Sequence, residues 1–132
     1  MPADLAQLRA ALVAAVGDDR LVDDPADLSF YGADRCRGGW PVRPSLAVFP
    51  RTVAEVQAVV RACAAHGAPI VPSGGRTGLA GAATATAGEV VLSLERMHRI
   101  LELDPAARTL RCEPGATLQA VQEAAAAAGL LY

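Results

Sequence analysis

The chain has 132 residues, of which 52% are hydrophobic and only 4% aromatic, and its formal net charge is −2. This composition indicates one folded domain with an aliphatic core and excludes a disordered chain. The near balance of charge, without a basic run, argues against a nucleic-acid surface. All 12 basic residues are arginines. Mechanisms that need a lysine, such as Schiff-base formation or a lysine on a nucleotide's terminal phosphate, are therefore excluded.

The cysteines and histidines show no metal-ligating or nucleophilic arrangement. Cys36, Cys63 and Cys112 are far apart and match no CxxC or Cys/His spacing. Cys63 falls in a helical apolar pattern and Cys112 in a strand pattern, so both are expected to be small buried residues. His66 is expected at a helix end and His98 on the surface. We therefore expect no catalytic residue and no metal site in this chain.

The first third of the chain indicates a helical arm followed by a loop. Apolar spacing predicts a helix over Asp4–Val16. The acidic stretch 18–24 is expected to form a solvated turn, and Pro25–Tyr31 a short helix. Glycines and prolines exclude regular structure over most of Gly32–Pro44, where Trp40 is expected to pack the loop onto the core.

The pattern then changes to that of an α/β domain. Apolar strands are expected over Leu46–Phe49 and Pro69–Val71. Between them, Thr52 and Glu55 have the S/T-x-x-E form of a capping box, and the helix that they open is expected to end at Gly67. A strand, a helix and a strand in so short a stretch form a βαβ crossover, which implies parallel pairing. The inner face of the helix is expected to carry apolar residues at steps of three and four, namely Val53, Val56, Val60 and Cys63.

The stretch from Ile70 to Ala83 reads IVPSGGRTGLAGAA and is the strongest indication of a site. It leaves the carboxyl end of a predicted parallel strand, which is where open α/β sheets bind ligands. Its glycines let main-chain N–H groups converge on an anion, and only Arg76 and Thr77 add polar side chains to its centre. It is neither a P-loop nor a GxGxxG motif. We interpret it as a phosphate or pyrophosphate site, with a plain flexible loop as the alternative; any reaction would belong to a bound cofactor.

The remaining elements are a strand, a hairpin and a helix. Glu89–Leu94 is expected to be a third buried strand, and Ile100–Leu103 with Leu110–Cys112 a hairpin that has one wet face. Thr117 is expected to cap a helix that runs through Ala128. Its inward residues are expected to be Leu118, Val121, Ala124 and Ala125.

Three segments together resemble one family. They are PRTVAEVQAVVRACAAHGAPIVPSGGRTGLAGAA, EVVLSLERMHRI and CEPGATLQAVQEAAAAAGLLY, and the resemblance covers about residues 32–132. The family is that of the FAD-linked oxidases of the vanillyl-alcohol oxidase (PCMH-type) superfamily, and the nearest branch is that of glycolate oxidase and the D-lactate and D-2-hydroxyglutarate dehydrogenases. The resemblance implies an α+β fold, with a small parallel βαβ sheet flanked by helices and the start of a second, antiparallel subdomain.

The resemblance also implies a cofactor site, because in that family the glycine-rich loop holds the pyrophosphate of FAD. Relatives with a histidyl-linked flavin have histidine where this chain has Arg76, so non-covalent FAD is expected. The loop ends in Gly81-Ala82 where many members have two glycines, which narrows access to the backbone slightly. The cofactor-binding residues are then expected to be Pro72, Ser73, Gly74, Gly75, Arg76, Thr77, Gly78, Gly81, Ala82, Pro114 and Gly115.

A parent enzyme of this kind would oxidise a D-2-hydroxyacid by hydride transfer to the flavin, and the electrons would leave to a separate acceptor. Residues 1–45 would be an N-terminal helical arm and loop, and residues 46–132 the N-terminal part of the FAD-binding domain. The apolar end Leu130–Tyr132 resembles the start of another element. We therefore expect a fragment that binds FAD weakly and is inactive by itself.

A different class of function stays open at this point, namely a stand-alone phosphate- or nucleotide-binding module or a protein-interaction module. Continuation of the reading frame into further FAD-binding motifs would exclude it. The sequence shows no secretory signal and no transmembrane span, so we expect the cytoplasm, with a membrane-peripheral position as the alternative for a parent enzyme. The apolar end and the open hairpin edge also predict self-association of the fragment.

Overall fold

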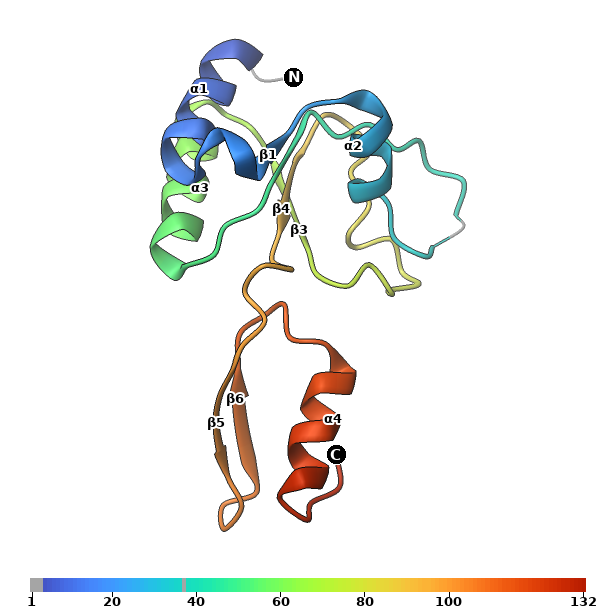
Figure 1. Cartoon of the computed structure of the whole chain (residues 1–132). Helices are drawn as coiled ribbons and strands as arrows, with labels where there is room; N and C mark the ends of the chain where they lie inside the picture. The colour runs from blue at the N-terminus through green and yellow to red at the C-terminus, as the bar shows by residue number, and fades with distance from the viewer. Residues whose placement is uncertain (1–3, 37) are drawn as a thin grey trace.

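The computed structural model describes residues 4–36 and 38–132. These residues form a larger lobe with a sheet and three α-helices, and a smaller lobe made of a hairpin and one helix (Figure 1). The chain enters the smaller lobe through residues 94–99, and the turn at 113–115 packs back on this connection. Within the described residues, no helix is both long and apolar enough to cross a membrane.

Among the described residues, four strands build the sheet of the larger lobe in the order β1-β2-β4-β3. β1 (Leu21–Val22) runs antiparallel to β2 (Leu46–Val48). β2, β4 (Val90–Ser93) and β3 (Ile70–Ser73) are parallel to one another. The carboxyl ends of the parallel strands point towards the smaller lobe (Figure 1).

The strand order corrects the predicted pairing across the βαβ unit. The strands before and after α3 (Val53–Ala65) are parallel as expected, but β4 lies between them and pairs with both. All four residues of β4 are buried, which suits the centre of a sheet. β3 contains Pro72, which has no N–H to donate to a second neighbour and therefore favours an edge.

The core lies on both faces of this sheet. α1 (Leu5–Val16) and α3 cover one face, and α2 (Pro25–Tyr31) covers the other (Figure 1). The first cluster includes Leu8, Leu12, Leu46, Val48, Val59, Cys63, Val90 and Leu92. The second consists of Leu28, Ala47, Phe49, Ala85 and Val91. Successive residues of β4 alternate between the two clusters, as the pleat of a strand requires.

The predicted caps of the later helices are confirmed. Thr52 Oγ1 accepts a hydrogen bond from Glu55 N at 3.2 Å, and Thr117 Oγ1 accepts one from Ala120 N at 3.1 Å. The Glu55 carboxylate accepts from Arg51 N at 2.6 Å and from Arg20 Nη1 at 2.7 Å. These bonds, that from Arg20 first, hold the pKa of Glu55 below its ordinary value.

The inner face of α3 differs from the prediction. Val59 and Cys63 are buried, whereas Val53 is 64% and Val60 43% exposed. The helix is rich in alanine and valine, so more apolar residues are present than the buried stripe can hold. Cys63 and the partly buried Val56 pack in the core as predicted, and periodicity alone was wrong for Val53 and Val60.

The acidic stretch 18–24 also differs from the prediction of a plain solvated turn. It contains a 3₁₀ turn, η1 (Asp18–Arg20), and then β1. A strand of two residues has no periodicity of its own, so the sequence carried no signal for it. Pairing with β2 and the ion pair between Arg20 and Glu55 keep the segment in place.

The smaller lobe contains the expected hairpin, β5 (Ile100–Asp104) and β6 (Thr109–Cys112), and α4 (Leu118–Ala127), which packs against it. A bulge between Ile100 and Glu102 breaks the alternation along β5, and Leu101 is 44% exposed. The expected burial of Cys112 is wrong, because this residue is exposed. Leu118 of α4 is 59% exposed, and the buried residues of this helix are Val121 and Ala125. One helix covers only one face of a hairpin.

Candidate nucleotide-binding site

The glycine-rich loop connects β3 to β4 at the carboxyl edge of the parallel strands. It contains no regular secondary structure between Ser73 and Val90, as predicted for a loop that does not open a helix. Arg35 N donates to Gly78 O at 3.1 Å, and Ala85 N donates to Gly32 O at 2.9 Å. The loop is therefore held at two points against the irregular segment that follows α2.

A hollow of about 250 Å³ lies in the neck between the two lobes. The glycine-rich loop forms one wall of this hollow, and the connection after β4 forms a second wall. The 115–120 segment, which includes the first turn of α4, forms the third wall. We call it the neck hollow. Its lining residues are Gly74, Gly75, Arg76, Glu95, His98, Gly115, Thr117 and Ala120. The structure thus brings the loop together with the 114–115 turn, two segments that in the sequence are connected only through a family resemblance.

Gly74 and Gly75 leave the backbone open on the side of the neck hollow. Neither takes a positive φ. A Cβ at Gly74 would meet nothing within 4 Å, and one at Gly75 would meet only Thr77 Cγ2 at 3.9 Å. The fold itself therefore does not require glycine at these positions. Glycine there lets another molecule approach the main chain.

Two other predicted glycines have structural reasons to be glycine. A Cβ at Gly115 would lie 2.0 Å from Leu94 O, and Gly115 N donates to Met97 O at 2.7 Å. Gly81 has a φ of +79°, and a Cβ there would lie 2.3 Å from Cζ3 of Trp40. Trp40 thus packs on the loop, although 52% of it is exposed.

The Arg76 side chain is bound to protein groups. Its Nη1 lies 3.3 Å from Glu95 Oε2, and its guanidinium carbon lies 4.7 Å from the centre of the Phe30 ring and 5.2 Å from that of Tyr31. The side chain is 17% exposed. Its backbone has a φ of +54°, in the left-handed region. The guanidinium is therefore engaged within the protein, at the edge of the hollow that its residue helps to line.

Asp34 holds the far half of the loop. Its carboxylate accepts hydrogen bonds from Cys36 N at 2.8 Å and from Thr84 Oγ1 at 3.1 Å. The bond from Cys36 N, with further bonds from Thr84 and from the backbone of Ala83 and Gly81, holds the pKa of Asp34 below its ordinary value, and burial opposes this shift. Asp34 was not among the residues predicted from the sequence. The only local signal in the sequence is that an aspartate can accept a hydrogen bond from the backbone N–H two residues later, as Asp34 does from Cys36 N.

Two buried serines stand side by side where β3 and β4 end. Ser73 and Ser93 are paired in register and are 2% and 0% exposed. Within the described part of the chain, neither hydroxyl has a hydrogen-bond partner. Such hydroxyls are uncommon in folded proteins, and here they supply polar atoms at the root of the glycine-rich loop. Ser73 was predicted to belong to the site, and Ser93 was not.

The other predicted residues are distributed around the loop. A Cβ at Gly78 would lie 3.7 Å from Asp34 Oδ2, and Gly81 and Ala82 line a separate hollow beside Trp40. The predicted residues that are exposed and line neither hollow are Pro72, Thr77, Gly78 and Pro114.

Glu95, His98 and Thr117 line the neck hollow, but no sequence motif connected them with the site. His98 is exposed as expected, and its Nδ1 lies 3.1 Å from Glu95 O. The sequence did carry a signal for Glu95 and His98. Both follow the carboxyl end of a predicted parallel strand, and the glycine-rich loop leaves from the same edge of the sheet. Thr117 caps α4, whose N-terminal end favours anions through the helix dipole.

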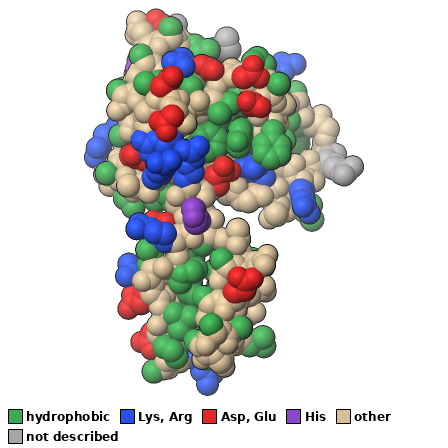
Figure 2. All heavy atoms as spheres, viewed as in Figure 1, with side chains coloured by type: hydrophobic (Ala, Val, Ile, Leu, Met, Phe, Trp, Pro, Cys, Tyr) green, Lys and Arg blue, Asp and Glu red, His purple; other side chains and the backbone are tan. Residues whose placement is uncertain are grey.

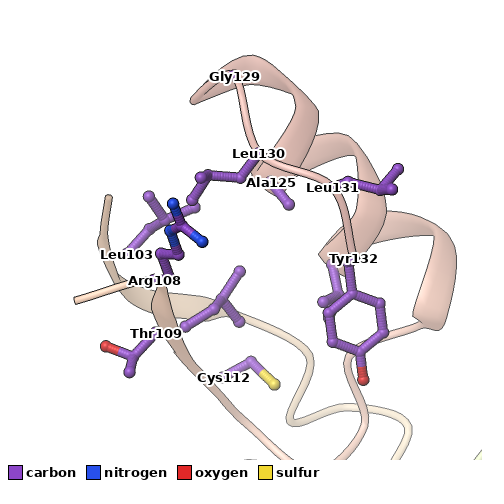
Figure 3. Close-up of a pocket in the computed structure, with 11 residues that line it drawn as sticks. Leu103, Arg108, Thr109, Cys112, Ala125, Gly129, Leu130, Leu131 and Tyr132 are labelled. Atoms are coloured by element: carbon purple, nitrogen blue, oxygen red, sulfur yellow. The ribbon is translucent and has the colours of Figure 1, made fainter. Parts of the chain in front are cut away.

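A second hollow, of about 410 Å³, lies in the smaller lobe between the hairpin, α4 and residues 129–132 (Figure 3). Leucine, valine and alanine side chains form most of its wall, with Arg108 as the one charged residue among those that line it. Figure 2 shows hydrophobic side chains gathered on this lobe and charged side chains of both signs mixed on the larger lobe. The wall of this hollow is mostly apolar, whereas the glycine-rich loop lines the neck hollow with main chain, so the neck hollow is the candidate site.

Comparison with known proteins gives the family. Residues 44–132 match the family model described as an FAD binding domain. The chain therefore belongs to the FAD-binding domain family, which confirms the resemblance seen in the sequence.

Two curated relatives with named activities are similar to this chain over most of its length. The chain is 48% identical over 122 residues to a D-2-hydroxyglutarate dehydrogenase of Xanthomonas citri pv. viticola, covering 92% of this chain and 26% of that protein. It is 38% identical over 118 residues to a D-lactate dehydrogenase of Anaerostipes hadrus, covering 89% of this chain and 23% of that protein. The chain thus spans only 26% and 23% of the lengths of these curated relatives.

Among solved structures, that of p-cresol methylhydroxylase with substrate bound matches with a TM-score of 0.81 and 29% identity, over 95% of this chain and 25% of that one. The predicted α+β fold of the PCMH type is therefore confirmed, including the start of a second, antiparallel subdomain.

Proposed function

We propose that the neck hollow and the adjoining glycine-rich loop hold the pyrophosphate of FAD. The observation that carries the proposal is the open backbone at Gly74 and Gly75, where the fold leaves space for a ligand and the main chain supplies the donors. The N-terminal turn of α4 lines the same hollow, and the buried hydroxyls of Ser73 and Ser93, without partners in the described part of the chain, stand where the loop begins and β4 ends. The residues present are thus suited to a diphosphate.

We also propose that FAD is held without a covalent bond, because arginine occupies the loop position at which histidyl-linked relatives have histidine. Acid precipitation of the flavin-loaded protein should release all of the flavin into the supernatant. Flavin that stays with the precipitate would contradict this part of the proposal.

The protein to which this domain belongs is proposed to be an oxidoreductase that acts on a D-2-hydroxyacid. The relatives named dehydrogenases of 2-hydroxyglutarate and lactate support this substrate class. Bound flavin would accept a hydride from the substrate carbon, and a separate acceptor would take the electrons. The residues described here bind and orient the cofactor, and none of them is assigned a catalytic role. We keep the predicted division into 1–45 and 46–132 as part of this proposal.

Calorimetric titration of the chain with FAD, ADP and FMN tests the site. FAD and ADP share a diphosphate, whereas FMN has a single phosphate, so FAD and ADP should bind and FMN should bind much more weakly. Gly74→Ala should raise the Kd for FAD and ADP about tenfold or more, because a methyl group would stand where phosphate oxygens meet the main chain.

Gly78→Ala is the matched control. Gly78 belongs to the same loop and was predicted to bind the cofactor, but it does not line the neck hollow. Its Cβ would lie 3.7 Å from Asp34 Oδ2, an ordinary contact, and its backbone also has no positive φ. It should therefore change the Kd for FAD much less than Gly74→Ala does. Equal losses in both variants would contradict the placement of the diphosphate. Tighter binding of FMN or of inorganic phosphate than of ADP would favour a phosphate-binding module of another kind.

A further inference from the structure

The aromatic residues of this chain are concentrated at the glycine-rich loop. The chain has only two phenylalanines, two tyrosines and one tryptophan. Trp40 packs on Gly81, and Phe30 and Tyr31 at the end of α2 lie against Arg76. In a chain whose core is otherwise aliphatic, this placement indicates that the loop is held by specific contacts.

Arg76 connects the loop to the core through these rings. The ring centres of Tyr31 and Phe49 are 4.8 Å apart in an edge-to-face arrangement, and Phe49 is 3% exposed. The Arg76 guanidinium lies over the rings of Phe30 and Tyr31, within the range of cation–π attraction. On its other side it pairs with Glu95, which follows β4. One side chain thus ties the loop to α2 and to the segment after β4, and Tyr31 extends this contact to Phe49 after β2.

The backbone at this residue is consistent with a loop held from outside. A φ of +54° is unfavourable for a residue with a long side chain and is usually taken by glycine or asparagine. Such a conformation persists where the surroundings determine it. At Arg76 the surroundings are the contacts of its own guanidinium, which leave the side chain only 17% exposed.

We propose that Arg76 is a positioning residue, which holds Gly74 and Gly75 open towards the neck hollow through Phe30, Tyr31 and Glu95 and does not itself bind the diphosphate. This inference rests on the proposed function, and it assigns Arg76 a role different from that of the phosphate-contacting side chain that the sequence predicts.

Amide hydrogen exchange of the protein without added nucleotide tests the positioning directly. Arg76→Lys keeps the positive charge but loses the planar group that stacks on the rings. Phe30→Leu removes one of the rings and leaves Arg76 unchanged. In both variants the amide of Arg35, which donates to Gly78 O and so holds the loop, should exchange about tenfold faster, while those of β4 stay unchanged. Phe30→Tyr, which restores a ring, should exchange like the wild type. Unchanged exchange in Phe30→Leu would overturn the proposal.

Binding of FAD then separates a positioning residue from a phosphate ligand. The titrations are made at a temperature at which every variant is fully folded, so that global stability does not enter. Phe30→Leu and Arg76→Lys should each raise the Kd about fivefold to tenfold, and the double variant should be no weaker than the weaker single one. Phe30→Tyr should bind FAD as the wild type does.

The dependence of the Kd for FAD on salt concentration distinguishes a positioning role of Arg76 from direct contact with the diphosphate. If Arg76 contacted the diphosphate, Arg76→Gln would flatten the salt dependence, and Phe30→Leu would bind like the wild type. That pair of results would overturn the positioning role. Failure of the wild type to bind FAD or ADP would instead refute the proposed function, and the exchange experiment would still decide what Arg76 does to the loop.

Discussion

Gly115→Ala and Gly74→Ala are the same chemical change in two walls of the neck hollow, and they should change stability in opposite directions. At Gly115 the new Cβ would be 2.0 Å from Leu94 O and 2.8 Å from both Leu94 C and Met97 O, all of them backbone atoms. Because a carbon and an oxygen in contact normally stay about 3.3 Å apart, the turn must move by about 1.3 Å. That movement also stretches the 2.7 Å hydrogen bond from Gly115 N to Met97 O.

The cost follows from these contacts. Overpacking of this kind destabilises by about 1–3 kcal/mol, and loss of the hydrogen bond adds about 1 kcal/mol, so the free energy of unfolding should fall by about 2–4 kcal/mol. For a chain of 132 residues this corresponds to a decrease in Tm of about 7–14 °C. At Gly74, where nothing lies within 4 Å and φ is not positive, alanine restricts the unfolded chain and should raise Tm by about 1–4 °C.

Thermal unfolding of the two variants and the wild type, followed by circular dichroism and by calorimetry, measures both effects. A Gly115→Ala protein that melts within 2 °C of the wild type, a margin of about 0.5 kcal/mol, would show that the 113–115 turn does not dock on the connection after β4. A Gly74→Ala protein destabilised as strongly as Gly115→Ala would show that the backbone at Gly74 is not open. Either result would remove the structural basis of the proposed site.

Further predictions concern the supports of the site and the core. The folded-state pKa of Asp34 is lowered, so its contribution to stability is present above its unfolded pKa of about 3.9 and is lost as pH falls through the folded value. Asp34→Asn should therefore weaken the acid dependence of the unfolding midpoint in urea below about pH 4. Leu12→Ala, at a position that is 0% exposed, should lower the free energy of unfolding by about 2–5 kcal/mol with an unchanged denaturant m-value. A loss under about 1 kcal/mol would mean that Leu12 is not packed in the first core cluster. A thiol reagent at mildly alkaline pH should label exposed Cys112 quickly and Cys63 only on unfolding. The reason is that Cys63 is buried, and burial raises the pKa of its thiol to about 11. Rapid labelling of Cys63 in the folded protein would contradict its burial.

Most elements could be predicted from the sequence because their signals are local. Thr52 and Thr117 mark helix starts through side chains that reach only three residues along the chain. Residues within a few positions also predict the hairpin around Asp104 and the strand that ends where the glycine-rich loop begins. The same holds for the absence of regular structure in that loop. The family resemblance rests on the same contiguous motifs.

The tertiary structure decided which elements are neighbours. The position of β4 between β2 and β3, the pairing of β1, and the exposure of Cys112 each depend on contacts between residues far apart in the sequence. The same holds for the site. Its glycines were visible as a motif, whereas Asp34 and the partners of Arg76 reach the loop from other segments, and His98 lines the hollow from the connection after β4. A sequence pattern reports the conformation that a stretch prefers, but the energy of a packed side chain depends on atoms that only the fold brings within a few ångströms.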